Sequence, residues 1–448
     1  MFSGDDLNVA TSTGVFADSH VAQGITVSIS GLTLGGTDLG NYTLASTTAS
    51  TTANITQAAL TVTALAQTKV YDGNTTVTSS ALGTGYSVSG LITGETLDSV
   101  TLAYATKDVS RDGNGVVQSN KTITVGGAVA TSGTQLTDYS ITYVNNTAST
   151  ITPYVVSLTG TRVYDATTDV AASKLVIGQL VGSETLTLTG VGTVADKNVA
   201  SGKAVALGTL ALGNGTAGGL GSNYTLVGGG RTVDVTQASL TVTTSNVVKT
   251  YDGTLSVSGA TTAAAPVVLT GSGTQLFGSD SLSGGDYAYT NANAGNSNRT
   301  VTVGNVTVND GFGGANYAVN YTVNTTSTIN RAAITVSTAD VVKTYDGNTS
   351  ALGTPLVTQG TLFTNVTNSG TLDNLSGGTY SFVGSNVSRV GGVASGAVLN
   401  DKVVTASNVT VNDGNGGVEH EASNIAMLFG WGGNHALTVQ LDSVKHTY

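Results

Sequence analysis

Short stretches in which apolar residues alternate with threonine recur along the chain. Leu60 and Val62 alternate with Thr in "AALTVTA", and Leu240 and Val242 do the same in "ASLTVTT". A period of two places alternate side chains on opposite faces of an extended backbone, so each stretch predicts a β-strand with one buried face. The segments between such stretches are rich in Gly and Asn, which favour turns. The pattern predicts an all-β chain.

The composition supports this fold class. The 448 residues include 60 Gly and only 3 Pro, and 10% are charged, against roughly 25% in an ordinary soluble domain. Hydrophobic residues still make up 39% of the chain. That fraction excludes the low-hydrophobicity, high-charge composition of a disordered protein.

The charge argues against two classes of partner. The formal net charge is −11, with 16 Lys and Arg and no basic cluster, so neither nucleic acid nor an anionic membrane surface is an expected partner. There is no Cys, which excludes disulfides, thiolate metal sites and a Cys nucleophile. No apolar run is long enough to predict a membrane span, and "MFSGDDLNVA" has no signal-peptide pattern.

Two motifs recur in the same order. A Tyr-Asp motif occurs in "KVYDGNTT", "RVYDATTD", "KTYDGTLS" and "KTYDGNTS", with its Tyr at 71, 164, 251 and 345. A second motif occurs as "NYTL", "DYSI", "NYTL" and "NYAV", with its Tyr at 42, 139, 224 and 317. A period near ninety residues suits a tandem array of small β-sandwich-like modules better than a β-helix, whose rungs are much shorter.

The Thr-rich strands give the boundaries of five repeats, numbered here 1 to 5. Repeats 2 to 4 are complete, and short linkers lacking flexible Gly-Ser runs predict stiff coupling into an elongated rod. The array is expected to be truncated at both ends, with an anomalous tail that suggests a fragment end, a fusion or a frame error and so a non-native segment. The predicted ranges are 1–57 (the C-terminal half of a repeat), 58–153, 154–237, 238–331, 332–417 (incomplete) and 418–448 (the tail).

"KVYDGNTT", the downstream "GNYTL" and the closing "ITQAALTVTA" together resemble the YDG-type repeat of haemagglutinin-like surface adhesins of Gram-negative bacteria, over residues 1–417. The resemblance implies a secreted or cell-surface protein, exported through an outer-membrane partner by two-partner secretion. It implies a role in adhesion or as a stalk, and no catalytic residue. One copy departs from the motif, because Ala166 replaces the Gly. If the turn demands a positive φ, that Ala costs roughly 1–2 kcal/mol.

The Tyr-Asp motif has a structural interpretation. Asp can bond to its own backbone two residues on, Gly permits the turn, and Tyr buries its ring with the hydroxyl at the rim. We expect the Tyr residues to fill cores and the Asp residues to form turns. The residues of this structural motif are Tyr71, Asp72, Gly73, Tyr164, Asp165, Tyr251, Asp252, Gly253, Tyr345, Asp346 and Gly347.

A second recurring acid opens a chemical alternative. After each motif comes an acid, one residue and then Leu, as in Glu95 with Leu97. Two carboxylates brought together in each repeat would resemble a calcium site or the acid pair of a glycosidase. The spacing between the two acids varies, which disfavours catalysis. The calcium candidates are Asp72, Glu95, Asp165, Glu184, Asp252, Asp280, Asp346 and Asp373.

The sequence gives less support to other metal-binding or catalytic sites. "NDGFGG" and "NDGNGG" resemble calcium-binding turns but fit tight Asn-Asp-Gly turns better, and no EF-hand spacing appears. His20 stands alone, and three other His lie in the tail. We therefore predict no enzyme and no cofactor other than the calcium alternative. Asn-x-Ser/Thr sequons leave glycosylation open.

The sequence thus predicts the structural stalk of a secreted bacterial adhesin, presenting or mediating attachment at the cell surface. The alternative is that the repeats themselves bind glycan or calcium in attachment or in a biofilm matrix. The receptor, on a host or bacterial surface, is not encoded in any motif. One fold can serve as spacer and as binding tip.

Overall fold

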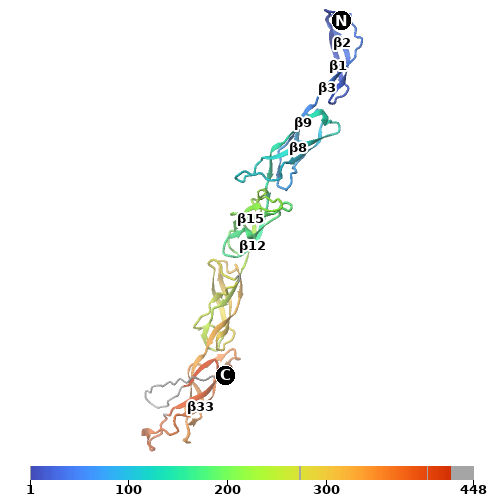
Figure 1. The fold of residues 1–448 in the computed structure, drawn as a ribbon. Coiled ribbons are helices and arrows are strands. Elements are labelled where there is room, and N and C mark those ends of the chain that lie inside the picture. Colours follow the sequence, from blue (N-terminus) through green and yellow to red (C-terminus); the bar gives the residue numbers. More distant parts are fainter. Residues whose placement is uncertain (1, 272–273, 401, 425–448) are drawn as a thin grey trace. The chain divides into compact units, whose positions relative to one another are not determined.

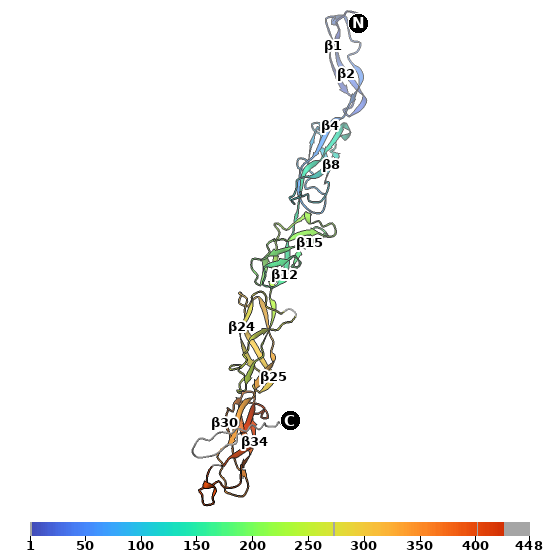
Figure 2. The same ribbon diagram turned by 60° about the vertical axis from the view of Figure 1, so that its left-hand side comes forward.

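The computed structural model describes residues 2–271, 274–400 and 402–424, and these are built almost wholly from β-strands (Figure 1). Within these ranges the helical segments are five 3₁₀ turns of three residues each, and no helix could cross a membrane. The all-β prediction is confirmed. Figure 2 shows the same succession of small sheets from a second direction.

The chain divides into two compact units. Unit 1 comprises Met1–Thr161, Asp169–Ala195 and Gly202–Val233. Unit 2 comprises Arg162–Thr168, Asp196–Ser201 and the chain from Asp234 onward. The division runs through repeat 3, so its Tyr-Asp loop and its 196–201 loop group with repeat 4. Loops at the end of one repeat therefore belong structurally with the next.

Repeats 2 and 4 have the same topology, with two sheets each. In repeat 2 the sheets are β6-β4-β9 and β5-β10-β8-β7, and in repeat 4 they are β23-β21-β26 and β22-β27-β25-β24. The first strand of each pairs in parallel with a late strand, as β4 does with β9. Packing of β4 on β8, and of β21 on β25, brings the two sheets together as layers.

The strands of repeat 2 are β4 (Ala58–Ala64), β5 (Thr68–Val70), β6 (Tyr86–Ser89), β7 (Leu97–Tyr104), β8 (Lys121–Ala130), β9 (Tyr139–Val144) and β10 (Asn146–Thr152), with the 3₁₀ turn η2 (Leu136–Asp138). Those of repeat 4 are β21 (Ala238–Thr244), β22 (Val248–Thr250), β23 (Pro266–Val268), β24 (Ser281–Tyr289), β25 (Gly295–Asn309), β26 (Tyr317–Tyr321) and β27 (Asn324–Asn330).

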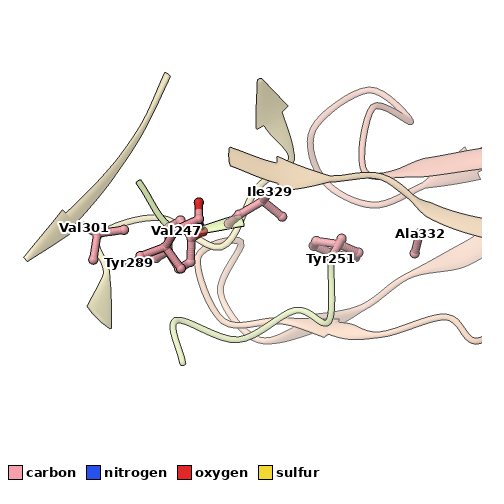
Figure 3. Close-up of a cluster of buried hydrophobic side chains, with 6 residues drawn as sticks. All are labelled: Val247, Tyr251, Tyr289, Val301, Ile329 and Ala332. Carbon is pink, nitrogen blue, oxygen red and sulfur yellow. Dashed lines mark hydrogen bonds between the residues drawn. The ribbon is translucent and has the colours of Figure 1, made fainter. Parts of the chain in front are cut away.

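The predicted alternation explains the cores. Leu60, Val62, Leu240 and Val242 are fully buried, whereas the Thr residues between them are partly exposed. In repeat 4 a buried hydrophobic cluster packs at the second sheet (Figure 3). Its members are Val247, Tyr251, Tyr289, Val301, Ile329 and Ala332. In this view Tyr251 lies on the side of Ala332, which opens repeat 5, and away from Val301.

Repeat 3 forms smaller sheets, ordered β11-β19, β14-β12-β20-β17, β13-β16 and β15-β18. Its elements are β11 (Tyr154–Val155), β12 (Leu158–Val163), β13 (Asp169–Ala171), η3 (Ala172–Lys174), β14 (Leu175–Ile177), β15 (Leu186–Thr189), β16 (Val191–Thr193), β17 (Ala200–Ala204), β18 (Ala211–Asn214), η4 (Gly221–Asn223), β19 (Tyr224–Thr225) and β20 (Thr232–Thr236).

Repeat 1 has one sheet, β1-β2-β3, formed by β1 (Asn8–Phe16), β2 (Ala22–Gly35) and β3 (Ala49–Ile55), with η1 (Leu39–Asn41). These strands correspond to β24, β25 and β27 of repeat 4. Every residue of β1 is exposed. The reason is that the described part of repeat 1 has no counterpart of the sheet that contains β21.

Repeat 5 extends beyond the boundary predicted at residue 417. Its sheets are β30-β28-β35, β29-β33-β34 and β31-β32. Strand β35 (His420–Asn424) pairs in parallel with β28, with His420 opposite Ala332, as Tyr317 lies opposite Ala238 in repeat 4. The first residues assigned to the tail therefore complete a sheet. Residues 425–448, which make up the rest of the predicted tail, lie outside the described residues.

The other elements of repeat 5 are β28 (Ala332–Thr338), β29 (Ser350–Ala351), β30 (Pro355–Gln359), β31 (Thr364–Asn365), β32 (Thr371–Leu372), β33 (Asn374–Phe382), η5 (Val390–Gly392) and β34 (Val404–Asn412).

Candidate functional site

The Tyr-Asp motif forms the predicted turn. Asp72 Oδ1 accepts the backbone N–H of Asn74 at 3.1 Å, and Lys69 Nζ donates to the same oxygen at 2.7 Å. Lys69 also donates to the backbone carbonyls of Asn74 (2.8 Å) and Thr76 (3.1 Å), and its side chain is 5% exposed. A buried ammonium with all three donors used holds the loop closed.

The cation three residues before the Asp also belongs to the Tyr-Asp motif. Sequence reasoning did not include it, although every copy has Lys or Arg at that position. Three corresponding ion pairs join Arg162 to Asp165 (2.5 Å), Lys249 to Asp252 (2.7 Å) and Lys343 to Asp346 (2.7 Å). Burial alone would raise the pKa of the Asp72 carboxyl, but the Lys69 and Asn74 hydrogen bonds outweigh it and lower that pKa.

The residue after the Asp adopts a left-handed conformation in all four copies. Gly73, Gly253 and Gly347 have φ values of 79°, 73° and 81°, and Ala166 has 63°. Repeat 3 therefore keeps the turn and accepts the strain of a Cβ there, instead of relaxing the turn.

The Tyr of the motif lies at the junction with the following repeat. Tyr71, Tyr164 and Tyr251 are at most 1% exposed. Their hydroxyls donate to the carboxylates of the recurring acids one repeat later, and not to acids of their own repeat. The three hydrogen bonds are Tyr71 to Glu184 Oε1 (2.6 Å), Tyr164 to Asp280 Oδ2 (2.9 Å) and Tyr251 to Asp373 Oδ2 (3.0 Å).

The prediction that Tyr345 fills a core is wrong, because Tyr345 is 59% exposed. Within the described residues no carboxylate of a further repeat accepts its hydroxyl. Its segment also lacks the strand that the equivalent residues form in β5 and β22, since residues 339–346 are irregular.

The second motif supplies the other half of the junction. Tyr224 donates to Glu184 Oε2 at 2.7 Å, and its hydroxyl accepts the backbone N–H of Val181 at 3.1 Å. The ring of Tyr71 packs edge-on against that of Tyr224, with centroids 5.5 Å apart. One carboxylate thus receives two hydroxyl donors, one from each repeat. Burial, helped by the Glu184 charge, raises the pKa of Tyr224 to about 12.

The next junction repeats this geometry. Tyr317 donates to Asp280 Oδ2 at 2.7 Å and accepts the N–H of Phe277 at 2.8 Å. Tyr164 packs edge-on against Tyr317 and Phe277, at centroid distances of 5.4 and 6.3 Å. A lysine lies beside each of these carboxylates, Lys107 at 3.6 Å from Glu184 and Lys197 at 3.4 Å from Asp280.

Histidine replaces the second tyrosine at the junction between repeats 4 and 5. His420 Nε2 lies 2.9 Å from Asp373 Oδ2, and its ring packs edge-on against Tyr251. The side chains of Asp373 and His420 are at most 1% exposed. Here an imidazole takes the place of the phenol. The anomalous composition of the tail concealed this substitution in the sequence.

A polar residue just before the second Tyr forms a second contact between repeats. Asn223 Oδ1 accepts the backbone N–H of Val109 at 2.8 Å, and Asn316 Oδ1 accepts that of Val199 at 2.9 Å. Asp138 accepts the N–H of Val21 in the same way at 2.9 Å, and Glu419 accepts that of Ala294. Each repeat thus binds a loop of its predecessor.

His20 belongs to this second contact. Its Nδ1 lies 2.6 Å from Asp138 Oδ2. The hydrogen bond to Asp138 raises the pKa of His20, and the same bond, with the Val21 N–H, lowers the pKa of Asp138. His435 and His446 lie outside the described residues.

The carboxylates proposed to pair within a repeat have different partners. Asp72 is bound by Lys69, whereas Glu95 accepts the hydroxyl of Tyr139. Over the described ranges no group of three or more His, Cys, Asp or Glu side chains is close enough to hold a metal ion. The calcium candidates instead divide into turn formers and junction acceptors.

The "NDGFGG" and "NDGNGG" segments are backbone-bound turns. Asp310 accepts the N–H groups of Phe312 (2.7 Å), Gly314 (2.8 Å) and Asn316 (3.1 Å). Burial would raise the pKa of Asp310, but these donors lower it. Asp413 binds Asn415, Gly417 and Glu419 in the same way. Each turn places the polar residue that contacts the preceding repeat.

Comparison with known proteins identifies the family to which the repeats belong. A family model for the YDG domain matches residues 1–49, 56–150, 146–232 and 236–328, which together exceed two thirds of the chain. The chain belongs to the YDG domain family. The matched segments follow YDG repeats 1 to 4 closely. None of the curated proteins matches the chain.

Proposed function

We propose that this chain is part of the stalk of a secreted bacterial adhesin of the haemagglutinin-like type, in which YDG repeats hold a binding region away from the cell surface. The observation that carries the proposal is the buried carboxylate that joins Tyr71 of one repeat to Tyr224 of the next through Glu184. The role is mechanical, without catalysis or a cofactor, and extracellular after export through an outer-membrane partner.

The energetics of the junction favour stiffness. The side chains of Glu184, Asp280 and Asp373 are 7%, 2% and 1% exposed. A hydrogen bond to a charged group contributes about 1.5–3 kcal/mol. Bending that separates the repeats would break the hydrogen bond from Tyr71 to Glu184 and expose the buried Tyr71 ring to water, and both losses oppose the bend. The repeats should therefore keep one relative orientation most of the time.

The short linkers between repeats also favour stiffness. Ile151 is fully buried in β10, and Tyr154 begins repeat 3 only three residues later. Gln57 and Gln237, the last residues of repeats 1 and 3, donate to the carbonyls of Thr137 and Ala315 in the following repeats at 3.1 Å each. Little chain is left free to act as a hinge.

The test is a distance distribution across one junction. Since the chain has no Cys, spin labels can be placed singly at exposed Val129 in repeat 2 and Val176 in repeat 3. We expect a narrow distribution that broadens in the Tyr71→Phe, Glu184→Gln double variant. Tyr143→Phe is the matched control, because that hydroxyl accepts the Ala128 N–H within repeat 2.

A wild-type distribution as broad as that of a flexible linker would overturn the stalk role. Direct binding of the chain to cells or to immobilised glycans, unchanged by the junction variants, would favour the alternative in which the repeats themselves are the attachment modules.

A further inference from the structure

The loop that each repeat docks onto its successor makes one constant contact and carries one variable side chain. The constant contact is a backbone N–H, of Val21, Val109 or Val199, which the residue just before the second Tyr accepts at 2.8–2.9 Å. We call this acceptor the socket residue, and the residue just before the Val the loop residue. The socket residues of repeats 2, 3 and 4 are Asp138, Asn223 and Asn316. The loop residues that face them, from repeats 1, 2 and 3, are His20, Asp108 and Asn198.

The backbone bond decides what the socket residue offers to the loop residue. An Asn whose Oδ1 accepts the Val N–H has only its NH₂ group left for the loop residue, whereas an Asp still has a carboxylate oxygen. Turning the amide round would leave the buried N–H of Val109 without an acceptor. An Asn socket therefore requires an acceptor on the loop, and an Asp socket requires a donor.

The loop residues meet these requirements at three junctions. The pairs are Asn223 Nδ2 to Asp108 Oδ1 (2.8 Å), Asn316 Nδ2 to Asn198 Oδ1 (3.1 Å) and His20 Nδ1 to Asp138 Oδ2 (2.6 Å). Each amide group thus faces an oxygen, and the carboxylate faces an imidazole nitrogen. Because Asn223 and Asn316 are fully buried, little water is available to compensate a mismatched partner.

The junction of repeats 4 and 5 avoids the pair altogether. Its socket residue, Glu419, accepts the N–H of Ala294 and uses its other oxygen for Asn415 Nδ2 at 2.6 Å. The loop residue, Asn293, instead accepts from Asn365 Nδ2 at 2.8 Å. At none of the four junctions in the described part of the chain do two carboxylates meet at this contact.

We propose that the loop and socket residues select which repeat can follow which. The loop of repeat 2, with Asp108, fits a repeat that has an Asn socket and rejects one that has an acidic socket. The sockets of repeats 2 and 5, Asp138 and Glu419, would each set a carboxylate against Asp108. Juxtaposed like charges suppress wrong partners at an interface.

This selection concerns the order of the repeats, and it therefore goes beyond the proposed role as a stalk. The repeats have similar strands and the same Tyr-carboxylate contacts, so those features alone do not distinguish one successor from another. Pairing of repeats out of order is a characteristic failure of multidomain and repeat proteins. The loop and socket residues oppose it at the point where two repeats first touch side chain to side chain.

The test gives repeat 3 the socket of repeat 2 within the full chain, by Asn223→Asp. The readout is amide hydrogen exchange at pH 7, followed by mass spectrometry on the segment that contains Val109. We expect exchange about tenfold faster or more, because Asp108 then faces a carboxylate and the junction opens more often.

A rescue separates rejection by Asp108 from the general cost of a new carboxylate. In the Asp108→Asn, Asn223→Asp double variant the loop amide can turn and donate to the socket, so exchange should return close to the wild-type rate. Asp108→Asn alone is the control. It should leave exchange nearly unchanged, because it reproduces the Asn198–Asn316 pair.

The next junction shows whether the effect is local. In Asn223→Asp the segment that contains Val199 should exchange at the wild-type rate. Equal acceleration at Val109 and Val199 would mean general unfolding and would overturn the proposal. Unchanged exchange in Asn223→Asp would also overturn it, as would faster exchange that Asp108→Asn does not restore.

Discussion

The hydroxyl of Tyr71 donates a 2.6 Å hydrogen bond to Glu184, although 113 residues separate them in the chain. Because one partner belongs to repeat 2 and the other to repeat 3, the bond couples the folding of the two. We expect Tyr71→Phe to destabilise the pair by about 1.5–3 kcal/mol and Tyr71→Ala, which also removes a buried ring, by about 3–5 kcal/mol.

A double-mutant cycle of Tyr71→Phe and Glu184→Gln, read by denaturant unfolding, measures this coupling. A coupling energy near zero would mean that the bond does not join the repeats. Equal losses in Tyr71→Phe and in the exposed control Tyr143→Phe would mean the same.

Ala166→Gly should stabilise repeat 3. The left-handed φ of 63° costs Ala roughly 1–2 kcal/mol. Glycine removes that strain but adds about 0.4–1 kcal/mol of unfolded-chain entropy, so the net gain is about 0.5–1 kcal/mol. Thermal unfolding measures it, and a lower midpoint in the variant would contradict the strain.

The loss of stability on replacing the turn Gly with Ala should depend on whether the following repeat packs against the turn. A Cβ on Gly253 would lie 2.3 Å from the Thr364 carbonyl oxygen of repeat 5, whereas a Cβ on Gly347 would meet nothing within 4 Å. Both substitutions carry the same backbone strain. We expect Gly253→Ala to reduce stability markedly more than Gly347→Ala, measured by chemical denaturation, and equal losses would contradict the packing at this junction.

The contact between His20 and Asp138 should depend on pH. The folded-state pKa of His20 lies above 6.5, so its contribution is complete below pH 6.5 and is lost as the pH rises through the raised value. The pKa of Asp138 lies below 3.8, so its contribution is lost only as the pH falls through that lowered value. The contact is therefore strongest between about pH 4 and 6.5.

An NMR titration of the His20 imidazole checks this prediction. In Asp138→Asn the pKa of His20 should fall toward its ordinary value. An unchanged titration would show that the carboxylate does not control the ring.

Removal of calcium should leave the melting temperature unchanged. The turn carboxylates are bound by Lys or Arg, and the junction carboxylates receive tyrosine or histidine donors. A cation would have to displace those partners. Calorimetry with added calcium and with chelator measures the effect, and a calcium-dependent rise of several degrees would restore the metal-site hypothesis.

The sequence predicts much of the local structure. Alternation at Leu60 and Val62 locates a strand and its buried face, and the Tyr-Asp motif locates a turn, because both depend on residues close together in the chain. The departure at Ala166 even identifies the strained copy. Local chemistry of this kind needs no knowledge of the neighbouring repeat.

The partners of the recurring acids could not be predicted in the same way. Glu184 was paired with Asp165 of its own repeat, whereas the fold brings it to Tyr71 of the previous one. The signal was present, since an acid and two tyrosines recur in fixed order, but a repeat period does not say which copies touch. His420 was concealed further, because an imidazole replaces the tyrosine of the motif.

The parallel pairing of the terminal strands has a mechanical consequence. In repeat 2 the first strand, β4, is bonded in parallel to β9, and the last strand, β10, is bonded in parallel to β5. A pull on the two ends of such a domain slides these strands lengthwise, so their hydrogen bonds bear the load together instead of opening one after another. In repeats 2 and 4, tension on the chain therefore meets its greatest resistance within the domain, before any strand can peel away.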